Sequence, residues 1–76
     1  NPFMVQVDPL PGNEKPNKNG HDGQEYDYVI EGTLEVTIEE KVMVLNPGDS
    51  IYFDSKKQHC FRSLNGEPAK FLCIII

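Results

Sequence analysis

Short alternating runs separated by turn residues dominate this chain, and no segment keeps a helical period over even three turns. The clearest run is residues 33–38, where Leu34, Val36 and Ile38 share one face and polar residues share the other. Such alternation is typical of a strand with one buried face. The same reasoning predicts seven strands, at residues 3–7, 25–31, 33–38, 41–45, 50–53, 58–64 and 69–76. Seven short strands favour an all-β fold, a small antiparallel barrel or sandwich.

The connections between these strands differ in length. Residues 46–49 read Asn-Pro-Gly-Asp, in which proline presets one backbone angle and glycine supplies a positive φ, so a tight turn is predicted there. Gly32 interrupts an otherwise continuous extended stretch and predicts a sharp bend. Residues 8–20 form a polar loop with three prolines and two glycines. Loops of this length inside a small domain are often functional.

A chain of 76 residues forms one domain with a small core, so it needs an additional stabilising element. Its two cysteines, Cys60 and Cys73, are too few for a disulfide framework and are expected to be free thiols. A metal or a second subunit is therefore the expected stabiliser. We expect a homodimer that uses the terminal strands, residues 3–7 and 71–76. The chain lacks an initiator methionine, which suggests a fragment of a longer protein.

The net charge of −5 argues against nucleic acid and anionic membranes as direct partners. An acidic domain does not by itself bind these polyanionic surfaces. No apolar run reaches the roughly 20 residues of a membrane span. The first residues lack the basic start and apolar core of a signal peptide. These features together predict a cytoplasmic protein.

The chain's two histidines and one glutamate form a candidate metal site. His21 and Glu25 are four residues apart, so in an extended segment both side chains point to the same face. His59 lies near the start of a strand that could face them across a barrel. Two imidazoles and one carboxylate suit Zn(II), Fe(II), Mn(II) or Ni(II) and leave coordination positions open. Asp27 shares the face of Glu25 and is a second acidic candidate.

Simpler interpretations of these residues remain open. A histidine in an acidic β-protein is usually a surface or hydrogen-bonded residue, and Glu25 and Asp27 could be solvated strand residues. Cys60 adjoins His59, but neighbouring strand residues point to opposite faces, so a Cys-His nucleophile pair is not expected.

Two segments resemble the conserved motifs of the cupin superfamily. Residues 20–32 are similar to the first motif, with His21, Glu25 and Gly32 at its spacing, and residues 47–55 together with His59 are similar to the second. Asn19 stands where the first motif has its first histidine, so three of the four usual ligands are present. The resemblance covers roughly residues 19–76. It implies a double-stranded β-helix, a jelly-roll-like barrel, with a metal site at His21, Glu25 and His59.

Within the superfamily, residues 21–25, 28–32 and 48–55 resemble the sensor half of bacterial helix-turn-helix/cupin transcription regulators. That resemblance implies a domain that binds a small-molecule effector, with or without a metal, while another domain contacts DNA. Four further residues are the expected ligand-binding set: Asn19, Asp27, Tyr28 and Phe61. Two alternatives stay open, a metal-dependent dioxygenase, isomerase or decarboxylase, and a structural dimerisation domain with a vestigial pocket.

Overall fold

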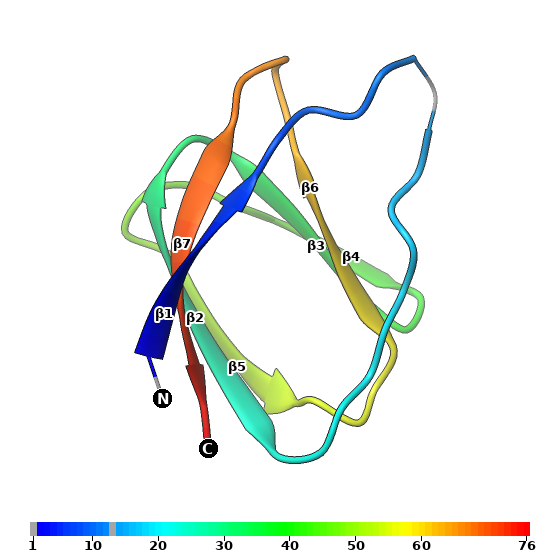
Figure 1. The fold of residues 1–76 in the computed structure, drawn as a ribbon, viewed down its shortest axis with the longest axis vertical. Coiled ribbons are helices and arrows are strands. Elements are labelled where there is room, and N and C mark those ends of the chain that lie inside the picture. The colour runs from blue at the N-terminus through cyan, green and yellow to red at the C-terminus, as the bar shows by residue number, and fades with distance from the viewer. Residues whose placement is uncertain (1, 13) are drawn as a thin grey trace.

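The computed structural model describes residues 2–12 and 14–76, and this part of the chain contains seven strands and no helix (Figure 1). Every predicted strand is present, with ends within one residue of the prediction, and the all-β class is confirmed. No helix long and apolar enough to cross a membrane occurs in the described residues. The strands are β1 (Pro2–Val7), β2 (Gln24–Glu31), β3 (Leu34–Ile38), β4 (Lys41–Leu45), β5 (Ser50–Asp54), β6 (His59–Ser63) and β7 (Ala69–Ile75).

The strands form two antiparallel sheets, in the orders β1-β7-β2-β5 and β4-β3-β6. Figure 1 shows the two sheets on opposite sides of a common interior. The chain crosses between them at Gly32, at residues 46–49, and again between β5 and β6 and between β6 and β7. Among the described strands, none of the first sheet pairs with one of the second, so the hydrogen-bonded ladder does not run continuously around the interior. The predicted closed barrel is therefore not shown, although a cupin jelly roll is consistent with this arrangement.

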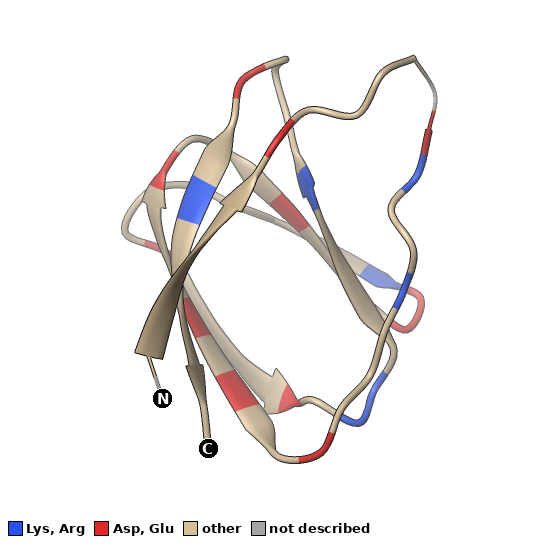
Figure 2. Cartoon of the chain, viewed as in Figure 1, with Lys and Arg blue, Asp and Glu red and all other residues tan. Residues whose placement is uncertain are grey.

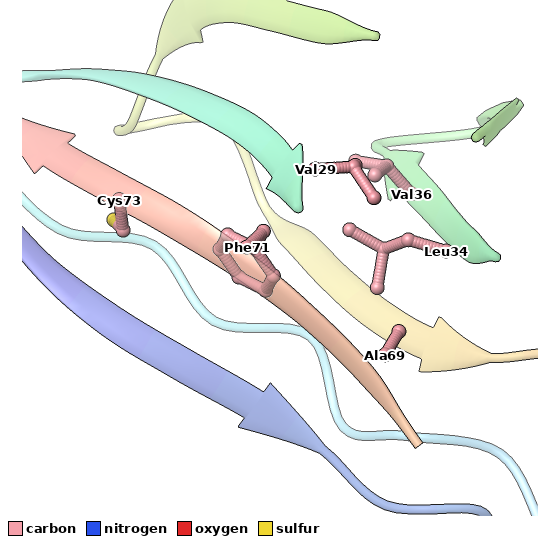
Figure 3. Packing of buried hydrophobic residues seen from close by; sticks show 6 residues of the cluster. All are labelled: Val29, Leu34, Val36, Ala69, Phe71 and Cys73. Carbon is pink, nitrogen blue, oxygen red and sulfur yellow. The ribbon is translucent and has the colours of Figure 1, made fainter. Parts of the chain in front are cut away.

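The inner face of β2 divides the interior into a polar and an apolar part. Glu25, Asp27 and Val29 alternate along the strand and all three are buried. Beyond Val29 the interior is filled by a cluster of apolar side chains from both sheets, shown in Figure 3. Its members are Val29, Leu34, Val36, Ala69, Phe71 and Cys73. The carboxylates thus lie at one end of the interior and the hydrophobic core at the other.

The long loop before β2 is fixed beside β6 by backbone hydrogen bonds. Asn19 and His59 exchange both of their backbone hydrogen bonds, at N···O distances of 2.9 and 2.8 Å. The backbone N–H of His21 donates to the carbonyl of Ser55 at 2.9 Å. In Figure 1 this segment runs alongside β6 toward the start of β2. The pairing delivers His21 to the polar end of the interior, although His21 belongs to no strand.

Candidate metal centre

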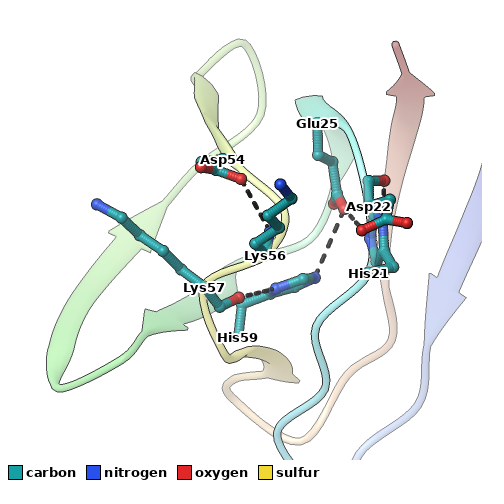
Figure 4. A network of polar contacts seen from close by, with 7 residues as sticks. All are labelled: His21, Asp22, Glu25, Asp54, Lys56, Lys57 and His59. Atoms are coloured by element: carbon teal, nitrogen blue, oxygen red, sulfur yellow. Dashed lines mark hydrogen bonds and ion pairs between the residues drawn. The ribbon is translucent and has the colours of Figure 1, made fainter.

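Three side chains from three separate segments meet at the polar end of the interior. Glu25 is the second residue of β2 and is 2% exposed, and His59 is the first residue of β6 and is 5% exposed. The His21 side chain reaches the same place from the loop and is 40% exposed. Figure 4 shows both imidazole rings directed at the Glu25 carboxylate. The two sheets and the loop therefore each contribute one potential metal ligand.

A single carboxylate oxygen is the meeting point of the site. The Nε2 atom of His21 lies 3.1 Å from Oε1 of Glu25, and the Nε2 atom of His59 lies 3.6 Å from the same oxygen. The two imidazole rings are 5.2 Å apart and nearly perpendicular, at 76°. The donor atoms of His21, Glu25 and His59 all lie within 4.8 Å of one another. The structure thus brings together the three predicted ligands.

Backbone carbonyl groups fix which imidazole nitrogen is free. Nδ1 of His59 lies 2.7 Å from the carbonyl oxygen of Lys57, and Nδ1 of His21 lies 3.2 Å from that of Asp22. A carbonyl oxygen only accepts hydrogen bonds, so each Nδ1 carries the proton and donates it. In the neutral rings both Nε2 lone pairs then face the Glu25 oxygen. The lone pairs of the two Nε2 atoms and of the Glu25 oxygen repel one another unless a positive charge lies among them. That charge is either a proton on one ring or a metal ion.

This donor set fits a divalent metal. Two neutral imidazole nitrogens and one carboxylate oxygen are ordinary ligands for Zn, Fe, Mn and Ni, and the Nδ1–H···O=C contacts are the usual support of such histidines. His21, Glu25 and His59 would hold the ion. When bound, such an ion would act as a Lewis acid or, if it is a redox metal, as an oxygen-binding centre. The chain's own contribution is to orient the ligands and to keep Glu25 buried.

The four predicted ligand-binding residues have different positions. Asp27 is fully buried on the inner face of β2, beside Glu25. The rings of Phe61 and Phe53 both pack edge-on against His59, with ring centroids 5.9 and 4.9 Å from its own. Asn19 pairs with His59 through its backbone. Tyr28 is not brought to the trio, because it alternates with Asp27 on β2 and lies on the outer face, 37% exposed.

An open cavity of about 500 Å³ lies between the long loop and Phe61. Its wall includes Val7, Leu10 and Pro16 and the charged side chains of Asp8, Glu14 and Lys15. The Phe61 ring is part of this wall and also contacts His59, whereas His21, Glu25 and His59 do not line the cavity.

Asp27 is a buried acid whose polar neighbours, the Glu25 carboxyl and the Cys73 thiol, are themselves acids. Among the residues that the structure describes, neither carboxyl oxygen of Asp27 has a hydrogen-bond partner. Burial is the main cause that raises the pKa of Asp27 to about 8, and the neighbouring Glu25 carboxyl adds to the shift. The Asp27 carboxyl therefore carries a proton at neutral pH in the metal-free chain.

This shift predicts how the stability of the metal-free chain depends on pH. The Asp27 carboxyl ionises near pH 4 in the unfolded chain and near pH 8 in the folded one, so between these values the folded state holds the extra proton. The free energy of unfolding therefore falls as pH rises from about 4 to 8. Asp27→Asn, which cannot titrate, should flatten this slope in urea denaturation with a chelator present. Asp22→Asn, at an exposed position, is the control. Equal slopes in wild type and Asp27→Asn would contradict the assignment.

Cys73 is a neighbour of Asp27 that sequence reasoning did not place at the site. The β2–β7 register puts Cys73 directly opposite Asp27 on the inner face, and both cysteines of the chain are free thiols, as predicted. Alternation of Ala69, Phe71 and Cys73 signals that Cys73 points inward. Its partner follows only from the pairing of two strands that are far apart in the sequence.

The chain matches the family model of the cupin domain over residues 5–75. It therefore belongs to the cupin family, as the motifs around His21 and His59 predicted. No curated protein matches the chain.

Solved structures with the same fold include an iron enzyme. Fe(II)-bound HppE with substrate is similar to 99% of this chain, with a TM-score of 0.86 and 24% identity. Hydroxypropylphosphonic acid epoxidase from S. wedmorenis in complex with fosfomycin is similar over 99% of the chain, with a TM-score of 0.84 and 26% identity. The chain spans 44% and 42% of these two proteins. A conserved protein of unknown function from Streptococcus pyogenes, 15% identical over 99% of this chain and 61% of its own, has a TM-score of 0.82.

Proposed function

We propose that this chain is a ligand-binding cupin domain that holds one divalent metal through His21, Glu25 and His59. The observation that carries the proposal is the convergence of two imidazole Nε2 atoms on one buried Glu25 oxygen, with each Nδ1 held by a backbone carbonyl. Three protein ligands leave coordination positions open for a small molecule.

The first function we propose for this site is effector sensing in a bacterial transcription regulator. The resemblance of residues 21–25, 28–32 and 48–55 to such sensor halves supports it. The acidic net charge of the chain is consistent with a domain that does not contact DNA itself, while another part of the protein does. The net charge is −5, and Figure 2 shows Lys and Arg spread over several elements. Effector binding would act by its different affinity for two states of the attached domain or dimer.

The second candidate is a metal-dependent enzyme, and one observation favours it. The chain shares its fold with Fe(II)-bound HppE, at 24% identity, and is 26% identical to hydroxypropylphosphonic acid epoxidase in complex with fosfomycin. In that case His21, Glu25 and His59 would orient the ion, and the aromatic rings of Phe53 and Phe61 would limit access of water to it. The substrate would bind in an open coordination position.

One sample distinguishes the two functions. The chain, purified without a polyhistidine tag and loaded with Fe(II) without oxygen, is mixed with small carboxylic and phosphonic acids, including hydroxypropylphosphonic acid. The sensor function predicts that at least one acid raises the melting temperature only with metal and is recovered unchanged after exposure to oxygen. The enzyme function predicts a product by mass spectrometry that His59→Ala does not form. If no acid raises the melting temperature and none is converted, both functions are contradicted and a structural domain is favoured.

We also propose that the chain forms a homodimer through the outer face of the four-stranded sheet. The strand registers place Met4, Leu72 and Tyr28 in one row across this face, and Tyr52 lies on the same face on β5. Met4 is 56% and Tyr52 58% exposed, which is unusual for large apolar side chains gathered on one surface. Sedimentation velocity at micromolar concentration should show a dimer in the wild type and a monomer in Met4→Lys. A monomeric wild type would contradict this proposal.

A further inference from the structure

A second group of potential metal ligands lies deeper in the interior than the histidine site. Asp27 and Cys73 face each other directly across the β2–β7 ladder, and Glu25 precedes Asp27 by two residues on the same inner face. All three are buried, with exposed fractions of 2% for Glu25, 0% for Asp27 and 4% for Cys73. One ligand atom from each lies within 4.8 Å of the others. We propose that Glu25, Asp27 and Cys73 form a second site, which binds a thiophilic divalent cation such as Zn(II), Co(II) or Cd(II).

The strongest support is the unpartnered carboxyl group of Asp27. Both of its oxygens are buried, and neither has a hydrogen-bond partner in the described residues. A buried polar group without a partner is costly and calls for a proton, a water or an ion that the protein atoms do not supply. The nearest polar groups are the Glu25 carboxyl and the Cys73 thiol, which are themselves acids. A cation would satisfy all three groups at once, whereas in the metal-free chain the three acids have only one another's protons to share.

Charge and ligand type determine the class of cation. Ionised, the three groups carry three negative charges, which favour a divalent ion over a neutral ligand. Thiolate is a soft ligand and selects Zn(II) and similar metals over Mg(II) or Ca(II). In the metal-free chain, burial raises the pKa of the Cys73 thiol and opposes ionisation. Metal binding would therefore displace the thiol proton, because a coordinating thiol is deprotonated.

Glu25 belongs to both groups of ligands. Its Oε1 faces His21 and His59, and the carboxylate has a second oxygen with which it can serve the deeper site. A carboxylate bridge between two ions is a known arrangement in two-metal sites. The histidine-side site opens to solvent through His21, whereas the deeper site has no exposed ligand. The deeper site should therefore fill second when metal is added.

Cobalt titration tests the deeper site directly. Thiolate coordination to Co(II) gives a near-ultraviolet charge-transfer band that imidazole and carboxylate ligands do not give. The reduced wild-type chain, titrated with Co(II) without oxygen, should develop this band and bind a second equivalent of metal. Cys60→Ser is the matched control, because Cys60 points outward on β6 and lines a separate surface groove. The band should persist in Cys60→Ser and disappear in Cys73→Ser.

Two further variants separate this site from the proposed function. His59→Ala should lose the histidine-side site and keep the thiolate band. Asp27→Asn should lower the Co(II) affinity of the deeper site, followed by this band, at least about tenfold. If Cys73→Ser does not fold, the wild-type titration still decides. No thiolate band in the wild type at saturating Co(II), or a band that Cys60→Ser abolishes, would overturn the deeper site while leaving the histidine-side site untouched.

Discussion

Glu25→Gln is expected to lower the affinity of the chain for a divalent metal by more than about 100-fold. Glu25 Oε1 is the atom that both imidazole Nε2 atoms approach, at 3.1 and 3.6 Å. Glutamine keeps the shape of the side chain, removes its charge and offers a poor ligand. Mutation of an outer residue that only orients a ligand already costs about 10–100-fold in metal affinity. Loss of the central ligand should cost more.

Competition with a chromophoric chelator measures this affinity, and Glu35→Gln is the matched control. Glu35 lies on β3 and lines a surface groove outside the interior, so Glu35→Gln removes the same charge as Glu25→Gln but from another strand. A metal at 100 times its dissociation constant adds about 2.7 kcal/mol of stability, which should raise the melting temperature of the wild type and of Glu35→Gln by roughly 10 °C or more. Glu25→Gln should show almost no rise. Wild-type affinity in Glu25→Gln would remove Glu25 from the site.

Gly32→Ala is expected to destabilise the fold by about 3 kcal/mol or more. Gly32 has a φ of +77°, and a Cβ there would lie 2.5 Å from the carbonyl oxygen of Pro68 and 2.9 Å from Cα of Ala69. Both neighbours are backbone atoms and cannot rotate away. The alanine would therefore add a clash to the cost of a positive φ, at a point where the chain crosses between the sheets.

Gly66→Ala separates the two costs of this substitution. Gly66 also has a positive φ, +69°, but nothing lies within 4 Å of the added Cβ. Its loss should be confined to the backbone term, about 1–2 kcal/mol. Thermal unfolding of the metal-free chains should therefore place Gly32→Ala at least roughly 5 °C below Gly66→Ala. Equal melting temperatures would mean that the Pro68–Ala69 segment moves aside.

The strands and the inward direction of most site residues could be predicted from the sequence, because both depend on local patterns. Alternation gives the strand and its buried face, so Glu25 and Asp27 were placed on one face before their partners were known. The same alternation puts Tyr28 on the outer face, away from Glu25 and Asp27. The motif spacing also identified His59, which lies at the start of a strand in the other sheet.

The remaining features depend on pairings between distant segments. The division into two sheets follows from which strands pair, and a strand's pattern does not name its partner. The position of His21 depends on the bridge between Asn19 and His59. The contact of Cys73 with Asp27 depends on the register of β2 against β7. The sequence alone predicts that Cys73 is a free thiol and that Asp27 is a solvated or metal-binding acid. Their proximity follows only from the fold.

The interior of this small domain links metal binding to folding. Its apolar cluster has six buried members, one of which is Cys73, and the two buried carboxyl groups of Glu25 and Asp27 lie beside it with only the histidines, Cys73 and each other as polar neighbours. Buried acidic groups lower stability unless a positive charge accompanies them. A bound metal would supply that charge, so the free energy of metal binding would appear as folding free energy.

Metal analysis of the chain purified without a polyhistidine tag tests the histidine-side centre most directly. With His21, Glu25 and His59 as ligands, we predict at least about one tightly bound divalent metal per chain, about one equivalent less in His59→Ala, and almost none in Glu25→Gln, each purified in the same way. A folded wild-type chain that stays metal-free and binds no added Zn(II), Fe(II), Mn(II) or Ni(II) would contradict the centre.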